Sequence, residues 1–343
     1  MDIYFDIEHL VSFIKRYYSH PNRDDLLRLL KSELNIKCTF DNSSLICNLK
    51  RADIEKVKHF LAQLTTGRGK SEPIKYTAKI PQLRLNHCQN QENPLENGLS
   101  DIYMVSNCSI VTVNDQSVDL CEVLLSPSKQ GDEVRILENL FIEESELSCD
   151  YLSQEMDDWN IIDENRSLCT DIIIVDKYIF SENDAIKDAN IYSILEILTQ
   201  SQHIPTNIII FATAEGLVLE SKQSDSGLIN TIKRIVKTKI GIEPNVTFVK
   251  CDSLLGEYKR IVHDRHIITN YKHFESRDSF NYFEGPSKPD TTLSINSLCK
   301  YDKFKNINLK LQKLQQVIDY LTDKPQLGPY IVGDKKSNYL TFN

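Results

Sequence analysis

The run Asp171-Ile172-Ile173-Ile174-Val175-Asp176 consists of β-branched residues with an aspartate at each end. An uninterrupted apolar segment of this length is typical of a strand that is buried on both faces of a sheet. Residues 207–211 and 246–249 repeat the pattern farther along the chain. Helical patterns separate these segments, so the sequence predicts an α/β fold with crossover helices on both faces of a mixed sheet.

The helical patterns around these strands have clear ends. Residues 191–198 and 228–240 carry apolar side chains at helical spacing, and the second pattern stops at Gly241. Two closely spaced strands are expected at residues 260–269 and 274–283, with a turn around Tyr271-Lys272-His273. Residues 304–321 form a Lys- and Gln-rich amphipathic pattern, which predicts a helix that docks on the core or forms a dimer seam.

The chain has 343 residues, which exceeds the usual size of a single core and favours two or more domains. We expect a small helical or α+β domain over residues 1–66 and a linker over 67–75. The linker contains Gly67-Arg68-Gly69-Lys70-Ser71, but Leu64 stands where a phosphate-binding loop needs its first glycine. We further expect a strand-rich region with an acidic segment over residues 76–164 and an α/β domain with a C-terminal helix over residues 165–343.

Composition points to a cytoplasmic protein. No apolar run approaches the length of a membrane span, and the start Met-Asp-Ile-Tyr-Phe-Asp lacks the basic and apolar segments of a signal peptide. The nine cysteines are scattered and form no Cys-x-x-Cys pair. We therefore expect reduced, buried thiols, no disulfide framework, no metal-ligand set and no cofactor.

The formal net charge of −9 conceals an asymmetry along the chain. Residues 228–343 contain 19 Lys and Arg against 12 Asp and Glu, whereas residues 1–227 contain 21 against 37. A basic last third would favour an anionic ligand, although lysines also simply solvate helix faces. The acidic first part is a candidate surface for a protein partner.

The basic third contains the strongest chemical signal in the sequence. Within residues 260–269, His263 and Arg265 are two positions apart, and side chains at this spacing leave a strand on the same face. They would place a proton carrier or nucleophile beside a fixed positive charge, which suits a phosphate group. Asp264 and His266 would point to the opposite face, where Asp264 is expected to pair with a lysine or arginine beneath the sheet.

The segment His263-Asp264-Arg265-His266-Ile267-Ile268-Thr269-Asn270 resembles the His-x-Lys-x-x-x-x-Asp motif of the phospholipase D superfamily. It is more similar still to the phospholipase-D-like domain that follows microtubule-interacting-and-transport domains, in which His-Asp-Arg replaces His-x-Lys. The similarity covers about residues 165–285. It implies a metal-independent phosphate site in which His263 attacks phosphorus, Arg265 neutralises the phosphate oxygens and Asn270 orients the imidazole.

Two features of the motif bear on turnover. Arginine retains the charge and offers a bidentate fork for phosphate, but asparagine cannot supply the negative charge that stabilises an imidazolium. The family also brings two histidines together, and this chain carries one such motif, so a homodimer would have to supply the second.

Three further residues are candidates for substrate binding. Ser276 and Arg277 lie where active relatives place a phosphate-binding Gly-Ser segment, although a polar hairpin edge is an equal alternative. Asp176 ends the first apolar strand, and ligands collect at the carboxyl ends of parallel strands. A helix cap or a loop salt bridge is the alternative role for Asp176.

The sequence therefore predicts a phosphodiester-recognising protein, with nucleic acid as one such ligand. It is either a metal-independent nuclease or phosphodiesterase that acts as a homodimer, or a catalytically inactive docking or phosphate-binding module. By analogy at the level of the fold alone, an accessory role in a bacterial defence or mobile-element system is a third hypothesis.

Overall fold

The computed structural model describes residues 2–38, 40, 49–66, 74–76, 102–104, 111–113, 116–118, 133–141, 143–148, 158–164, 171–200, 206–213, 225–284, 291–324 and 330–334. These residues divide into two compact units. The first contains the described residues up to Phe141 together with residues 299–301, and the second contains residues 143–298 and 302–334.

The first unit is built on a parallel sheet with the strand order β3-β2-β1-β4. A separate two-stranded antiparallel sheet, β5-β6, lies in the same part of the chain. The elements are β1 (Asp2–Phe5), α1 (Ile7–Tyr17), α2 (Arg23–Ser32), β2 (Asn35–Cys38), α4 (Arg51–Thr65), β3 (Ile74–Tyr76), β4 (Ile102–Met104), β5 (Val111–Val113), β6 (Gln116–Val118) and α6 (Glu133–Phe141).

Helix α1 joins the rest of this unit through apolar and polar contacts. The Phe13 ring lies 5.6 Å from the Phe60 ring of α4 and 5.5 Å from the Phe5 ring of β1. His9 and Glu133 are both fully buried, and His9 Nδ1 lies 2.8 Å from the Glu133 carboxylate. A buried carboxylate without a partner would lower the free energy of unfolding. The contact between His9 and Glu133 avoids this cost and joins α1 to α6.

The units do not follow the boundaries expected from the sequence. Residues 74–75, expected in the linker, belong to β3, while residues 67–73 lie outside the described residues. Elements from the expected strand-rich region are divided between the units: β4 pairs with β1 in the first, and β7 (Glu144–Ser148) belongs to the second. Strands of three residues are too short to show a clear hydrophobic period, so the sequence gives little sign of their pairing with distant segments.

The second unit is a mixed α/β structure around an eight-stranded sheet with the order β14-β10-β9-β8-β11-β12-β13-β7. Strands β8, β9 and β10 are parallel, and the strands on either side of them are antiparallel. After β7 the elements are α8 (Asn160–Glu164), β8 (Asp171–Val175), α9 (Asp184–Lys187), the π-helical turn η3 (Asp188–Tyr192), α10 (Ser193–Thr199), β9 (Asn207–Ala212), α12 (Asp225–Ile240), β10 (Asn245–Lys250), α13 (Gly256–Ile261), β11 (Arg265–Ile268), β12 (Lys272–Ser276), β13 (Thr292–Ser297), α14 (Tyr301–Thr322) and β14 (Ile331–Gly333).

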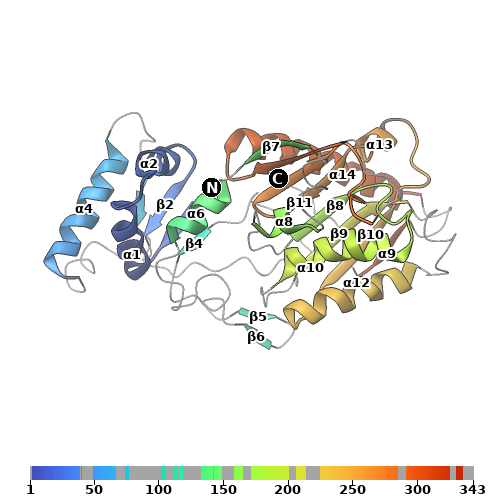
Figure 1. Ribbon diagram of the computed structural model, residues 1–343, viewed down its shortest axis with the longest axis horizontal. Helices are drawn as coiled ribbons and strands as arrows, with labels where there is room; N and C mark the ends of the chain where they lie inside the picture. The colour runs from blue at the N-terminus through green and yellow to red at the C-terminus, as the bar shows by residue number, and fades with distance from the viewer. Residues whose placement is uncertain are drawn as a thin grey trace. The chain divides into compact units, whose positions relative to one another are not determined.

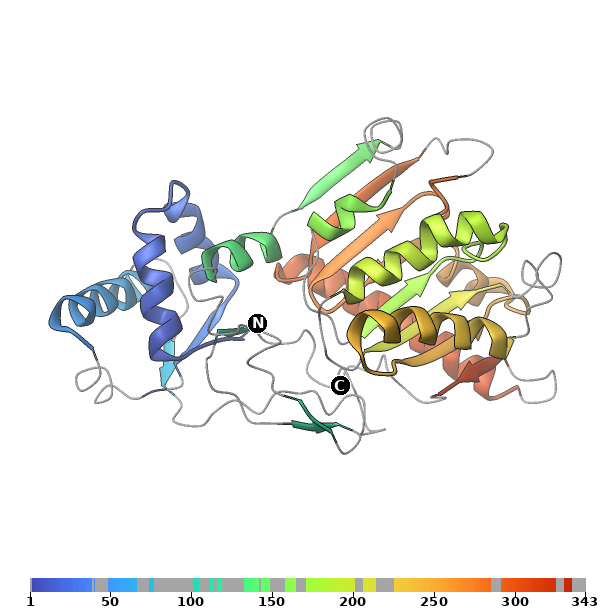
Figure 2. The same ribbon diagram turned by 60° about the horizontal axis from the view of Figure 1, so that its bottom comes forward.

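Helices cover both faces of this sheet, as expected (Figures 1 and 2). Helices α9, α10 and α12 lie on one face, where alternate side chains of the strands, including Ile172, Ile174 and Ile267, form the main core. Helix α14 lies on the other face and contacts β11 through Lys310. All residues of β8 and β9 are buried, which confirms the prediction of central strands.

The described cysteines Cys38, Cys251 and Cys299 are buried thiols that form no disulfide with one another, in agreement with the expected buried thiols. Burial raises the pKa of the Cys38 thiol to about 12, so this side chain stays protonated at neutral pH. None of the helices in the described ranges is both long enough and apolar enough to cross a lipid bilayer.

Two glycines with positive φ differ in what surrounds them. Gly333 pairs with Thr247 at the sheet edge and has φ of 115°, and an added Cβ would lie 2.1 Å from the Val246 carbonyl oxygen. Gly241, after α12, has φ of 74° with open space around the same position.

We expect Gly333→Ala to lower the free energy of unfolding by about 3 kcal/mol, because strain and a backbone clash combine. Gly241→Ala, the matched control, should cost only about 1 kcal/mol, because strain acts alone. Urea unfolding monitored by fluorescence of Trp159, the single tryptophan of the chain and buried in the second unit, measures both. Equal losses in the two variants would contradict the close approach at β14.

Candidate functional site

A pocket of about 400 Å³ lies at one end of the strands of the second unit, where β11 begins and β12 ends. These ends meet because the two strands are antiparallel, with Arg265 paired to Ser276. Strand β13 begins at the same edge because it is antiparallel to β12. The pocket is lined by His263, Asp264, Arg265, Glu275, Ser276, Arg277, Thr292 and Ser294.

His263 lies in a turn, which corrects the expected strand over residues 260–269. Residues Gly256–Ile261 form α13, and β11 starts only at Arg265. An acidic residue in the first turn of α13 and basic residues in its last turn favour this helix through the helix dipole. The His263 side chain is 71% exposed, and its Nδ1 lies 4.0 Å from an Asp264 carboxylate oxygen.

Arg265 begins β11, is partly exposed as a residue and lines the pocket. The guanidinium carbon lies 5.8 Å from the centre of the Tyr178 ring, within the range of a cation–π contact. Its Nε is buried without a hydrogen-bond partner, and no described carboxylate lies within ion-pair distance of the guanidinium. Arg265 therefore keeps hydrogen-bond donors for a ligand.

Asn270 does not reach His263, so the expected orienting contact is absent from the structure. Strand β11 is antiparallel to β8, which brings the residue beyond the end of β11 to the start of β8. There the Asn270 Oδ1 accepts a hydrogen bond from the Asp171 backbone N–H at 3.1 Å. Asn270 is buried at the opposite end of β11 from the pocket and fastens two strands together.

Asp176 is fully buried and does not line the pocket, which corrects its assignment as a substrate-binding residue. Its carboxylate accepts hydrogen bonds from the Tyr178 and Phe280 backbone N–H groups at 3.0 and 2.8 Å, and from the Ser279 hydroxyl at 2.7 Å. Burial raises the pKa of Asp176, and these bonds with the charge of Arg265 oppose that rise. Asp176 thus holds the loops after β8 and β12 together.

Ser276 and Arg277 both line the pocket, but only Arg277 has free donors. The Ser276 hydroxyl donates to the Asp278 carbonyl oxygen at 2.6 Å and contacts the Tyr282 hydroxyl, so it serves the turn after β12. Arg277 is exposed and has no ion pair with any described residue. The pocket therefore brings together His263, Arg265 and Arg277 as candidate ligand-binding groups.

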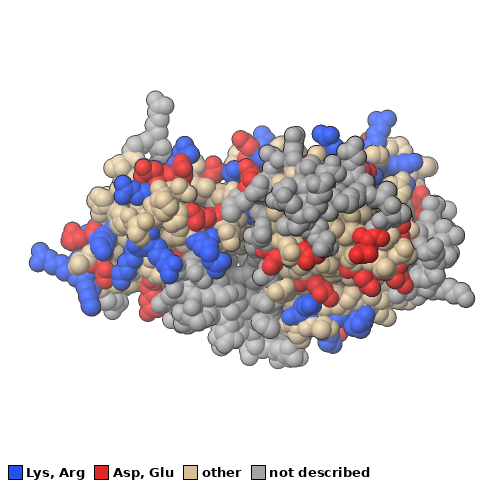
Figure 3. All heavy atoms as spheres, viewed as in Figure 1, with Lys and Arg blue, Asp and Glu red and all other residues tan. Residues whose placement is uncertain are grey.

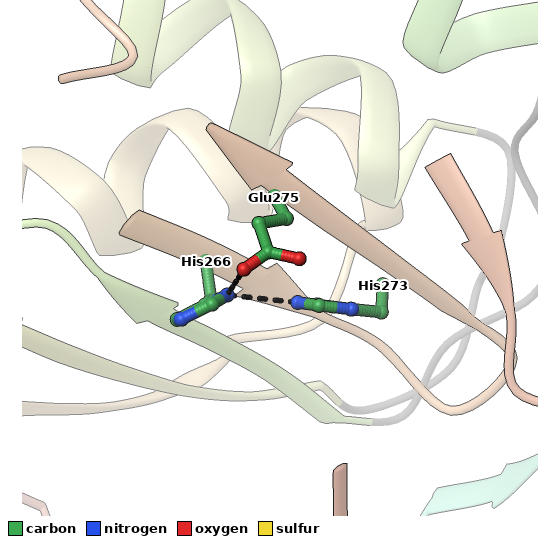
Figure 4. A group of neighbouring side chains, drawn as sticks. All are labelled: His266, His273 and Glu275. Carbon is green, nitrogen blue, oxygen red and sulfur yellow. Dashed lines mark hydrogen bonds and ion pairs between the residues drawn. The ribbon is translucent and has the colours of Figure 1, made fainter. Parts of the chain in front are cut away.

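The face of β11 opposite Arg265 carries a group of side chains that the sequence analysis missed. Figure 4 shows His266, His273 and Glu275 converging from β11 and β12, with His266 Nδ1 2.8 Å from His273 Nε2 and 3.9 Å from a Glu275 oxygen. Their donor atoms all lie within 4.8 Å of one another, a geometry that could hold a metal ion. The sequence analysis expected no metal-ligand set and did not foresee this group.

Lys310 of α14 completes this face. It donates to Asp264 at 3.2 Å, which confirms that Asp264 pairs with a basic residue beneath the sheet, and it contacts His266 Nε2. Burial lowers the pKa of Lys310, whereas Asp264 opposes the shift. Burial also raises the pKa of Glu275, with the Asp264 charge adding to the effect.

On the face drawn in Figure 3, acidic and basic side chains are interspersed.

No protein-family model, no curated protein and no solved structure matches this chain. The case for a function therefore rests on the geometry of the site and on the resemblance of the motif.

His273 gives the second unit a defined response to acid. Burial, with a smaller contribution from the Lys303 charge, lowers its pKa from 6.5 to about 3. Between these values the unfolded chain binds a proton that the folded protein does not, so the free energy of unfolding falls as the pH drops.

We expect the wild-type protein to lose about 2 kcal/mol through this group between pH 7 and pH 5, and His273→Gln to lose correspondingly less over the same interval. Urea unfolding followed by Trp159 fluorescence at both pH values measures the difference. His263→Gln, a change at an exposed histidine, is the control and should retain the wild-type pH dependence. An unchanged pH dependence in His273→Gln would show that the imidazole is not buried in its neutral form.

Proposed function

We propose that this chain is a phosphodiester-recognising protein whose second unit is phospholipase-D-like and binds a phosphate group of a nucleic acid in the pocket at the start of β11. The resemblance of residues 165–285 and the series of strands and helices from β8 to β11 support the family assignment. The observation that carries the binding proposal is the Arg265 guanidinium, which lines the pocket and forms no ion pair with a residue that the structure describes.

The balance of charge in the pocket supports an anionic ligand. Arg265 and Arg277 contribute two positive charges to the lining, and Asp264 and Glu275 contribute two carboxylates. The Asp264 carboxylate is already paired with Lys310. Of the two carboxylates that line the pocket, Glu275 therefore remains to balance the two arginine charges. Because arginine donates two parallel hydrogen bonds to a phosphate, Arg265 and Arg277 are well suited to hold a phosphodiester.

The pocket favours recognition over turnover. A histidine nucleophile needs a partner that orients the ring and stabilises its positive charge. Asn270 is engaged with Asp171 at the far end of β11. The described carboxylate beside His263, that of Asp264, is 4.0 Å away and is shared with Lys310. In this proposal His263 contributes a hydrogen bond to the bound phosphate.

A metal-independent phosphodiesterase is the second candidate, because the exposed imidazole of His263 lies beside Arg265 in one pocket. The family chemistry would also require a second histidine, which a homodimer would have to supply.

We expect Arg265→Gln to weaken binding of a fluorescently labelled single-stranded oligonucleotide roughly 10- to 100-fold, because charge-assisted hydrogen bonds are lost. The slope of the logarithm of the binding constant against the logarithm of the salt concentration should also become shallower by about one, the value for one lost phosphate contact. Fluorescence anisotropy at several salt concentrations measures both quantities. Arg234→Gln, at an exposed position on α12, is the control and should bind as the wild type does. Equal affinity of wild type and Arg265→Gln would show that the oligonucleotide does not bind in this pocket.

Incubation of labelled DNA and RNA with the protein in EDTA tests turnover. We expect no cleavage that distinguishes the wild type from His263→Ala, because the imidazole lacks its orienting partner. Cleavage by the wild type that disappears in His263→Ala would instead establish the phosphodiesterase.

A further inference from the structure

We propose that His266, His273 and Glu275 bind a divalent transition-metal ion of the zinc class on the face of the sheet covered by α14. The site shares Glu275 with the lining of the pocket, whereas its two histidines lie on the face of β11 opposite Arg265. The proposal does not depend on the function proposed above.

The register of the two strands places these ligands. His266 on β11 is directly paired with Glu275 on β12, and such cross-strand neighbours point to the same face of a sheet. His273 lies two positions before Glu275 on the same strand, so it shares that face and stands diagonally opposite His266. Three potential ligands are thereby fixed on two adjacent strands rather than on a mobile loop.

The donor distances are close to those of a metal site. Two ligand atoms bound tetrahedrally to zinc at about 2.0–2.1 Å are separated by roughly 3.3 Å. The observed separations from His266 Nδ1, 2.8 Å to His273 Nε2 and 3.9 Å to the Glu275 oxygen, lie on either side of this value. Small side-chain rotations would therefore bring the three donors into position (Figure 4).

The types of donor select the ion. Two imidazoles and one carboxylate favour zinc, cobalt or iron over magnesium and calcium, which prefer oxygen ligands alone. Three protein ligands also leave at least one coordination position for water. The Glu275 side chain is half exposed, so an ion and its water can enter from that side although both histidines are buried.

A carboxylate lies near the second ring nitrogen of His266, where metal-bound histidines usually have an outer partner. Its second ring nitrogen, Nε2, faces the Asp264 carboxylate at 3.9 Å and contacts Lys310. Metal binding at Nδ1 would require the ring proton to reside at Nε2, so the Lys310 ammonium would have to move away from Nε2 and the Asp264 carboxylate would have to approach from 3.9 Å to accept the proton. The proton now shared between the two imidazoles would leave the Nδ1–Nε2 contact as the ion enters.

Two lysines oppose a cation here, and their placement limits that opposition. Lys310 is paired with Asp264, whose carboxylate balances the ammonium charge. Lys303 directs its ammonium to the Asn296 side chain at 2.8 Å. Glu275 adds the negative charge that a divalent ion requires.

Titration of the full-length, EDTA-treated and desalted protein with Co²⁺ tests the site, because its visible absorption reports ligand type and geometry. We expect one Co²⁺ per chain with the absorption of nitrogen and oxygen ligands, and competition by Zn²⁺. Glu275→Gln should weaken binding by at least about tenfold while leaving unfolding by urea nearly unchanged, since the residue is half exposed. Glu182→Gln, at an exposed position before α9, is the control and should bind as the wild type does.

His273→Gln should also abolish binding, but the Glu275→Gln result decides the matter because it does not disturb a buried position. Unchanged Co²⁺ affinity in Glu275→Gln, absence of stoichiometric binding, or absorption bands of thiolate ligands would each overturn the proposal.

Discussion

The insertion of β11 between β8 and β12, antiparallel to both, determines where every candidate functional group of the second unit lies. The register pairs His266 with Val175 on one side and with Glu275 on the other. Because side chains alternate along a strand, the same register sends Asp264 and His266 to the α14 face and turns Arg265 the other way. A shift of one residue would exchange the two sets and bury the guanidinium in place of the imidazole.

Buried polar contacts around the pocket preserve this arrangement and leave its exposed groups available. Asp176 fastens the loop after β12 through Ser279 and Phe280, and Ser276 stabilises the turn that precedes that segment. Arg277 is carried on this fastened segment while its own side chain remains exposed. Residues that are equally polar in the sequence therefore have different roles. The buried ones form hydrogen bonds with the backbone of the loops, and the exposed ones are available to a ligand.

The sequence predicts the centre of the second unit well, since β8, β9 and β10 are short apolar runs and α12 and α14 carry apolar residues at helical spacing. It fails at His263, where the apolar pair Ile261-Val262 suggests a strand although the preceding residues form α13. It also places the hairpin turn around residues 271–273, whereas β12 already begins at Lys272. Strand register depends on such single-residue differences, so the convergence of His266, His273 and Glu275 could not be derived from spacing. A hairpin drawn with its turn at Asn270-Tyr271 would have revealed it.

We propose that the Arg265 guanidinium, which has no ion-pair partner among the described residues, receives a phosphate. The most direct measurement is the ¹⁵N-edited NMR signal of the Arg265 Nε–H group, assigned by its loss in Arg265→Gln. On titration with a dinucleotide this signal should move and saturate, and it should respond weakly to the uncharged methylphosphonate analogue. A signal that stays in place while the dinucleotide binds elsewhere on the protein would contradict the account.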